Sequence, residues 1–379
     1  MAMYNFKYMN ANKYTEEFIK DANKSHFEAK HLDCFSYNNA VILPWRIGKE
    51  WGYGGVLDSD LSFIKISENK GGENKSTRFG GSYEFDSDSI EYVNDKCIYI
   101  GPIRNHWGHI LVDCCSRVWA CNKKEFESYK VAYLIDNGTI EEKYICFFEL
   151  LGIKRERLCA VKNPQGFSEV VIPEQSYIPG TSWTKEYKLT MESVLANLEK
   201  LCIAKHTDLD KIYISRTHWK VRDIYGEYGE KVLQKLFEIN GYYTIYPEEL
   251  EIPELLHIIS HAKSIVTSMG TNAHAVALFA QNADDVIILN KRFLHVKHQV
   301  VLNELFDKEI IYIDTYFSYT LGIYLMGITK NVLRYCQDKH LKRLNPVFVG
   351  LSFVSSLVGY HVKVHWYPQI KNGKGMIKK

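Results

Sequence analysis

The length, composition and charge of the chain exclude several classes of protein. With 379 residues the chain is long enough for two domains of ordinary size, and two domains create a cleft between them. A hydrophobic content of 46%, a charged content of 24% and a formal net charge of +2 are ordinary for a soluble globular protein, and they argue against a nucleic acid as partner.

The cysteines and the start of the chain indicate its compartment. The nine cysteines are scattered, odd in number and free of Cys-x-x-Cys pairs, as is typical of reduced thiols in a cytoplasm. The first residues are polar and lack the apolar core of a secretory signal. No run of about 20 consecutive apolar residues is present, which argues against a spanning helix. We therefore expect a cytoplasmic protein.

The first half of the chain shows short strand signals separated by helical ones. Residues 1–90 are rich in Asn, Lys, Ser and Gly, and 68–75 has the composition of an exposed loop. The apolar pattern predicts strands over 97–100, 131–135 and 170–173, and helices over 107–121 and 141–151. The strand over 97–100 is expected to end at a tight turn formed by Gly101 and Pro102.

The second half alternates more regularly. A long helix over 185–205 bridges an expected boundary between an N-terminal acceptor-side domain, 1–185, and a C-terminal nucleotide-sugar-binding domain, 186–320. The predicted strands cover 211–215, 243–246, 264–267 and 285–289, and the predicted helices cover 229–240, 252–262 and 273–281. Strands separated by helices of this length indicate βαβ units and a parallel sheet, so the fold class is α/β.

The remainder, 321–379, is expected to be a C-terminal helical segment. The apolar stretch over 319–335 predicts a helix, and a second one over 346–360 is too short to cross a membrane. The tail carries four lysines, at 371, 374, 378 and 379. Two readings stay open, a pair of helices packed back on the body and docking on an anionic membrane surface.

The densest acid/base cluster of the chain consists of His106, His109 and Asp113. A helix that begins near Trp107 places His109 and Asp113 four residues apart on one face. Such a pair can work as a general base with a carboxylate that orients it. A metal site and a buried, noncatalytic histidine pair are the alternatives. Next to the histidines, Cys114 and Cys115 are either thiol nucleophiles or core residues of an apolar helix face.

A second polar cluster follows the predicted strand over 264–267. Its members at the start of the next helix are Ser268, Gly270, Thr271 and Asn272. Backbone N–H groups at a helix N-terminus can bind an anion, and Gly270 permits close approach, so a diphosphate would fit here. His274, in the first helical turn, is placed to donate to a phosphate or sugar oxygen. Simple helix capping and a structural histidine are the alternatives.

Charged side chains follow two further strands. Arg216 and Arg222 come after the strand over 211–215, and the planar guanidinium group suits phosphate oxygens. Glu248 follows the strand over 243–246, where its carboxylate can accept hydrogen bonds from ribose or sugar hydroxyls. Surface salt bridges and an acid responding to a helix dipole are the alternatives. Because ligands bind beyond the carboxyl ends of parallel strands, both clusters indicate an enzyme with a cleft.

At these residues the chain resembles glycosyltransferase family 61. The resemblance covers residues 96–292 and rests on Asn-His-Trp-Gly-His over 105–109 with Asp113, Tyr-Ile-Ser-Arg over 213–216 with Arg222, Tyr-Pro-Glu over 246–248, and Ser-Met-Gly-Thr-Asn-Ala-His over 268–274. It implies a GT-B architecture, in which two Rossmann-like domains face each other across a cleft. It also implies inverting transfer from a nucleotide-sugar donor, with the nucleotide held by the C-terminal half.

The resemblance and the clusters together predict an inverting glycosyltransferase of capsular or other surface polysaccharide biosynthesis. His109 or Asp113 would deprotonate the acceptor, His106 would position it, and the donor would be bound by Arg216 and the segment after Ser268. We expect no metal and no other cofactor. The partners would be a nucleotide sugar, a glycan or lipid-linked glycan acceptor, and the inner face of a membrane. The alternatives are a non-catalytic glycan-binding protein of this fold and a Cys/His acyltransferase or hydrolase.

Overall fold

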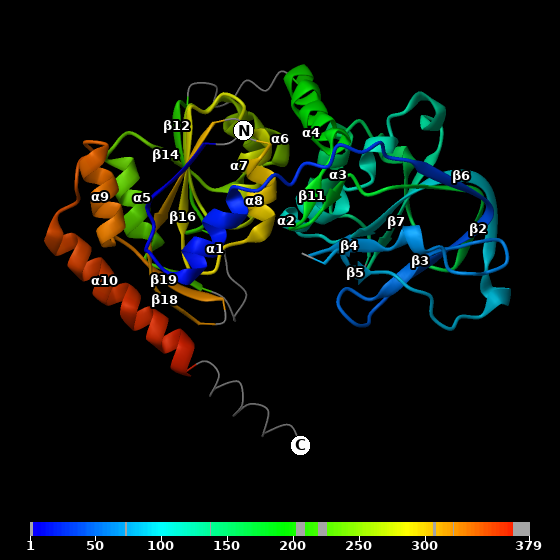
Figure 1. The fold of residues 1–379 in the computed structure, drawn as a ribbon, viewed down its shortest axis with the longest axis horizontal. Helices are drawn as coiled ribbons and strands as arrows, with labels where there is room; N and C mark the ends of the chain where they lie inside the picture. Colours follow the sequence, from blue (N-terminus) through cyan, green and yellow to red (C-terminus); the bar gives the residue numbers. More distant parts are fainter. Residues whose placement is uncertain are drawn as a thin grey trace.

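Two sheets of six strands with flanking helices make up most of the protein (Figure 1). The computed structural model describes residues 3–72, 74–136, 138–201, 209–218, 226–305, 308–320 and 322–366. Sheet I is formed within the first half of the chain, and sheet II mainly by the second half. The expected α/β class, with parallel strands and helices, is confirmed.

Sheet II is parallel throughout. Its strands run in the order β1 (Met3–Tyr8), β17 (Glu309–Asp314), β16 (Asp285–Asn290), β15 (Ser264–Ser268), β12 (Lys211–Ile214) and β14 (Tyr243–Ile245). Its helices include α5 (Glu230–Glu238), α6 (Ile252–His261), α7 (Thr271–Phe279) and α8 (Lys297–Asn303). The centre of β16, Ile287–Leu289, is buried, as a strand covered on both faces requires. The strands and helices predicted here are confirmed to within two residues.

The first strand of the chain lies at the edge of sheet II. β1 pairs in parallel with β17, and the helix that follows it, α1 (Lys13–Ala22), packs against α8. The chain then crosses to sheet I and returns through α4 (Lys185–Leu198) (Figure 1). Residues 3–22 therefore pack with the second half of the chain, which the polar composition of residues 1–90 did not indicate.

Sheet I is mixed. Its strands run in the order β3 (Tyr53–Leu57), β2 (Cys34–Arg46), β9 (Gln165–Pro173), β6 (Glu91–Ile103), β7 (Lys130–Ile135) and β8 (Leu158–Ala160). β6 and β7 are parallel neighbours, whereas β2 is antiparallel to both β3 and β9. The expected turn at Gly101 and Pro102 is wrong, because both residues lie inside β6 at an irregular register. Gly101 has φ +93°, and a Cβ there would lie 2.8 Å from Asn69 Oδ1.

A hairpin stands where residues 68–75 were expected to form an exposed loop. Its strands are β4 (Asn69–Gly71) and β5 (Ser76–Phe79). The fully buried Arg117 fixes its start, since its guanidinium donates to the carbonyl oxygens of Ile66 and Glu68 at 2.8 and 2.7 Å and to the Asn69 side chain. Arg117 Nε donates to Pro173 O at 2.9 Å, which ties the hairpin to sheet I.

Two predicted helices are corrected. The helix expected over 107–121 is a short α-helix, α2 (Trp107–His109), followed by a π-helical segment over Ile110–Cys114 and a 3-10 turn at Val118–Ala120. The helix expected over 319–335 is a β-hairpin, β18 (Tyr316–Thr320) and β19 (Ile323–Met326), followed by α9 (Lys330–Asp338). Aromatic and β-branched residues favour strands in that segment, and Gly322, with φ +87°, allows the turn.

Replacing Arg117 should detach the β4–β5 hairpin from sheet I and destabilise the protein. We expect Arg117→Met to lower the free energy of unfolding by about 3 kcal/mol or more, because it leaves several buried carbonyl groups without donors. Arg155→Met is the matched control. Arg155 forms an exposed ion pair with Glu142, so its loss should leave the stability nearly unchanged. Urea unfolding would measure both, and equal effects of the two substitutions would contradict the role given to Arg117.

Candidate functional site

The two halves of the chain meet where α2 approaches α7. A Cβ on Gly108 would lie 2.8 Å from Thr271 Oγ1, so only a glycine fits here without displacing that hydroxyl. Close by, α3 (Glu142–Leu150) and α4 pack against α6. Both polar clusters therefore lie at one interface, although they are far apart in the sequence.

A cavity of about 310 Å³ opens at this interface, within the usual size range of small-molecule sites. The first half of the chain lines it with His106, Trp107, Lys143 and Tyr144. The second half lines it with Arg216, Pro247, Glu248, Leu250, Ile252, Leu255, Thr271 and Asn272. The cavity thus brings together five of the predicted site residues, namely His106, Arg216, Glu248, Thr271 and Asn272.

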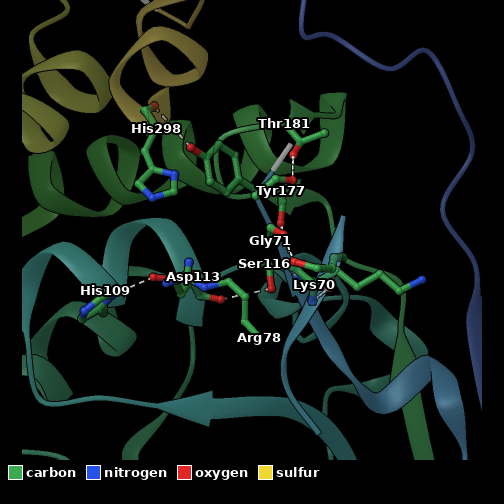
Figure 2. Close-up of polar contacts among 12 residues, drawn as sticks. Lys70, Gly71, Arg78, His109, Asp113, Ser116, Tyr177, Thr181 and His298 are labelled. Atoms are coloured by element: carbon green, nitrogen blue, oxygen red, sulfur yellow. Dashed lines mark hydrogen bonds and ion pairs between the residues drawn. The ribbon is translucent and has the colours of Figure 1, made fainter. Parts of the chain in front are cut away.

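The predicted pair of His109 and Asp113 is formed. His109 Nδ1 lies 2.8 Å from Asp113 Oδ2, and Arg78 donates to the other carboxylate oxygen, Oδ1, at 2.6 Å (Figure 2). Because a carboxylate only accepts hydrogen bonds, the proton of a neutral His109 stands on Nδ1 and the lone pair on Nε2. The Asp113 side chain is buried and bound at both oxygens. It is therefore placed to orient the imidazole rather than to take a proton itself.

Arg78 belongs to this group, and the sequence did not reveal it. Its guanidinium stacks on Trp51 with 4.6 Å to the ring centroid, and Trp51 meets the His109 ring edge to face at 4.9 Å. Arg78 reaches Asp113 because β5 forms, whereas the loop expected before it gave no reason to place a side chain there. No sequence signal connects these two residues, which are 35 positions apart.

His106 joins the two clusters electrostatically. Burial, followed by the positive fields of His109 and Arg216, lowers the pKa of His106 to about 4. The His106 and His109 ring centroids are 4.9 Å apart. His106 is therefore neutral at pH 7 and faces the cavity as a hydrogen-bonding imidazole, since so low a pKa makes it a weak base.

His274 is buried, and its free ring nitrogen is a hydrogen-bond acceptor. The sequence had predicted a hydrogen-bond donor at this position. Its Nδ1 lies 2.7 Å from Gln299 Oε1, and the amide nitrogen of Gln299 donates to Ala273 O at 3.0 Å. The proton of His274 is thus used on Gln299, which leaves the lone pair on Nε2. Burial lowers the pKa of His274 to about 4, so the ring is neutral at pH 7.

Two cations flank the N-terminus of α7. Arg216 follows β12 and Lys291 follows β16, and a Cβ on Gly270 would lie 3.9 Å from both Arg216 Nη1 and Lys291 Nζ. Their common partner is Glu227 Oε1, at 3.2 Å from Arg216 Nε and 2.7 Å from Lys291 Nζ. Sequence reasoning missed Lys291, although its position just beyond a buried strand was a usable signal.

Glu227 and the neighbouring Glu230 share one negative charge. Burial, and then the charge of Glu227, raises the pKa of Glu230. Burial also acts to raise the pKa of Glu227, but Lys291 and Arg216 outweigh it and the net shift is downward. With Glu230 protonated and Glu227 ionised, one carboxylate charge stands between the cations Arg216 and Lys291 beside the helix N-terminus. This arrangement suits a phosphate or diphosphate group.

Ser268 and Arg222 are the last two of the predicted binding residues. Ser268 Oγ is buried, with no hydrogen-bond partner among the described residues. Arg222 lies outside the residues that the structure describes. The part of the chain that is described contains no group of three His, Cys, Asp or Glu residues arranged for a metal, and the expectation of a metal-independent protein stays a prediction.

Cys114 and Cys115 are core residues in this structure. Both are fully buried, and burial raises the pKa of both thiols. A thiol nucleophile acts as the thiolate, which burial disfavours. The geometry therefore argues against these cysteines as nucleophiles.

The shared charge of the two glutamates can be tested by a double-mutant cycle. We expect Glu230→Gln to be nearly neutral and Glu227→Gln to cost little, because Glu230 can then ionise in its place. The double variant removes both carboxylates beside the buried Lys291 and the partly exposed Arg216, and it should lose about 3 kcal/mol or more of stability at pH 7. Added pyrophosphate should restore part of it. Thermal unfolding of the four proteins, with Glu249→Gln as exposed control, measures this, and additive effects would contradict the shared charge.

Searches with protein-family models and among curated proteins found no match for this chain. The resemblance to glycosyltransferase family 61 therefore rests only on the motifs quoted from the sequence. What this site does must be argued from the cavity and the charges around it.

Proposed function

We propose that the protein is an inverting glycosyltransferase with a GT-B arrangement, which transfers a sugar from a nucleotide-sugar donor to a glycan hydroxyl of a surface polysaccharide. One observation carries the proposal. The cavity is lined by the histidine-bearing segment of the first half and by the cation-flanked start of α7 in the second half. His106 lines the cavity, and the ring of His109 lies behind it at 4.9 Å between centroids. Displacement of a diphosphate by a hydroxyl group requires a base and an anion site close together.

The donor would bind on the side of sheet II. Arg216, Lys291 and the N–H groups at the start of α7 would hold the diphosphate, supported by the close approach that Gly270 permits. Glu248 would accept hydrogen bonds from hydroxyl groups of the donor. Leu250 and Ile252 line the same cavity with apolar side chains, against which the nucleobase of the donor would pack.

The acceptor would bind on the side of α2. Its hydroxyl oxygen attacks the anomeric carbon, the bond from that carbon to the diphosphate oxygen breaks, and the electron pair leaves with the nucleoside diphosphate. The hydroxyl proton passes to His109 Nε2. Asp113 and Arg78 fix the orientation of His109, and neutral His106 accepts a hydrogen bond that positions the acceptor.

The donor side can be tested with two cations at opposite ends of one strand. Arg216 follows the carboxyl end of β12, whereas Lys211 begins the strand and is exposed. We expect nucleoside diphosphates to raise the melting temperature of the native protein and of Lys211→Met. Arg216→Met and Lys291→Met should bind at least about tenfold more weakly, a loss of about 1.4 kcal/mol. Equal binding by all four proteins would contradict the diphosphate assignment.

The role of His109 as the base can be tested by comparing the His109–Asp113 pair with an exposed His–Asp pair elsewhere in the chain. His109→Gln should lower turnover of the accepted nucleotide sugar about 10² to 10⁴-fold while nucleoside diphosphate binding is retained, because a general base contributes about that much. His31→Gln is the control, since His31 forms an exposed pair with Asp33 at 3.4 Å and should stay fully active. Release of nucleoside diphosphate from a panel of nucleotide sugars measures this. Binding without any turnover in the native protein would favour a non-catalytic glycan-binding protein.

A further inference from the structure

The helix α10 (Pro346–His361) lies along the edge of the molecule (Figure 1). It carries an exposed apolar stripe. The stripe consists of Val347, Leu351, Val354, Val358 and Val362, each at least half exposed. These residues are spaced by three or four positions, so they lie on one face. With the π-helical turn that follows it, the helix reaches His365 and is long and apolar enough to cross a membrane, which corrects the expectation that it is too short.

The opposite face of α10 is attached to the protein. The hydroxyl of Tyr360 lies 3.0 Å from both Ser318 Oγ and Thr320 Oγ1, and the ring of Phe353 packs on Phe317 at 4.9 Å. Tyr360 is only 4% exposed. The second half of the helix therefore packs against the β18–β19 hairpin. Crossing a membrane would break these contacts, whereas lying on a membrane surface would keep them.

The part of the sequence that contains α10 carries charges of one sign. Residues 339–379 contain Lys339, Lys342, Arg343, Lys363, Lys371, Lys374, Lys378 and Lys379. They contain no aspartate or glutamate. The remaining 338 residues hold 39 of the 47 basic residues and all 45 acidic ones, so they carry six more acids than bases. The excess positive charge of the chain is thus concentrated in the same part of the sequence as the exposed apolar stripe.

We propose that α10 docks the protein on the surface of an anionic membrane. The apolar stripe enters the boundary between headgroups and acyl chains, and the lysines and arginines at both helix ends contact the lipid phosphates. A second copy of the chain fits this surface less well, because two stripes packed face to face would bring like-charged helix ends together in either orientation. This inference does not depend on the proposed sugar transfer.

The test is flotation of the full chain with vesicles. We expect binding to vesicles of phosphatidylcholine and phosphatidylglycerol to be at least tenfold stronger than to phosphatidylcholine alone, and to weaken as salt is raised. A triple variant of the exposed stripe, Leu351→Gln, Val354→Gln and Val358→Gln, should lose this binding and stay folded by circular dichroism. The control triple, Ile47→Gln, Tyr92→Gln and Leu189→Gln, alters exposed apolar residues elsewhere and should bind normally.

Three results would overturn the proposal. Binding that ignores lipid charge and survives high salt and alkaline washing would indicate a spanning helix. Self-association that the stripe variant abolishes, without vesicle binding, would indicate an interface between copies. Equal loss of binding in the control triple would show that the stripe has no special role. The double variant Lys339→Gln, Lys342→Gln should bind anionic vesicles more weakly but bind phosphatidylcholine vesicles as the native protein does. This difference separates the contribution of charge from that of the apolar stripe.

Discussion

The approach of Gly108 to Thr271 is the contact on which the candidate site depends. A Cβ at position 108 would lie 2.8 Å from the Thr271 hydroxyl and 3.3 Å from the His106 ring, so a larger residue would push α2 away from α7. The two segments belong to different sheets and bring different chemistry, imidazoles from one and cations from the other. A side chain at position 108 would move α2 and α7 apart, and the residues that now line one cavity would then lie on two separate surfaces.

The electrostatics of the two sides are complementary. Cations that suit a diphosphate also lower the pKa of any imidazole nearby, as Arg216 does for His106. Asp113 places a carboxylate oxygen 2.8 Å from His109 Nδ1. Arg78 in turn donates to the other oxygen of that buried carboxylate, at 2.6 Å. The Arg78–Asp113–His109 series of contacts would therefore allow a histidine base to lie close to an anion-binding site.

The sequence predicted sheet II better than sheet I for a physical reason. Parallel strands buried on both faces are continuous apolar runs, and each ends at a position where ligand-binding residues are expected, which is how Arg216 and Gly270 could be found. The position of Lys291 follows the same rule. Arg78 does not, because its contact with Asp113 requires a hairpin that Arg117 holds in place through backbone carbonyl groups. Such long-range hydrogen bonds leave no periodic trace in a sequence.

The position of β1 at the edge of sheet II has a consequence for how the protein can be divided and how it can move. A fragment that starts at residue 186 would lack this strand and would leave the backbone groups of β17 open, a template for aggregation. The chain also passes between the sheets twice, after α1 and before α4. If the cavity opens, both connecting segments must bend at the same time. Two connections restrict the directions in which the two sheets can move apart, whereas a single linker would not.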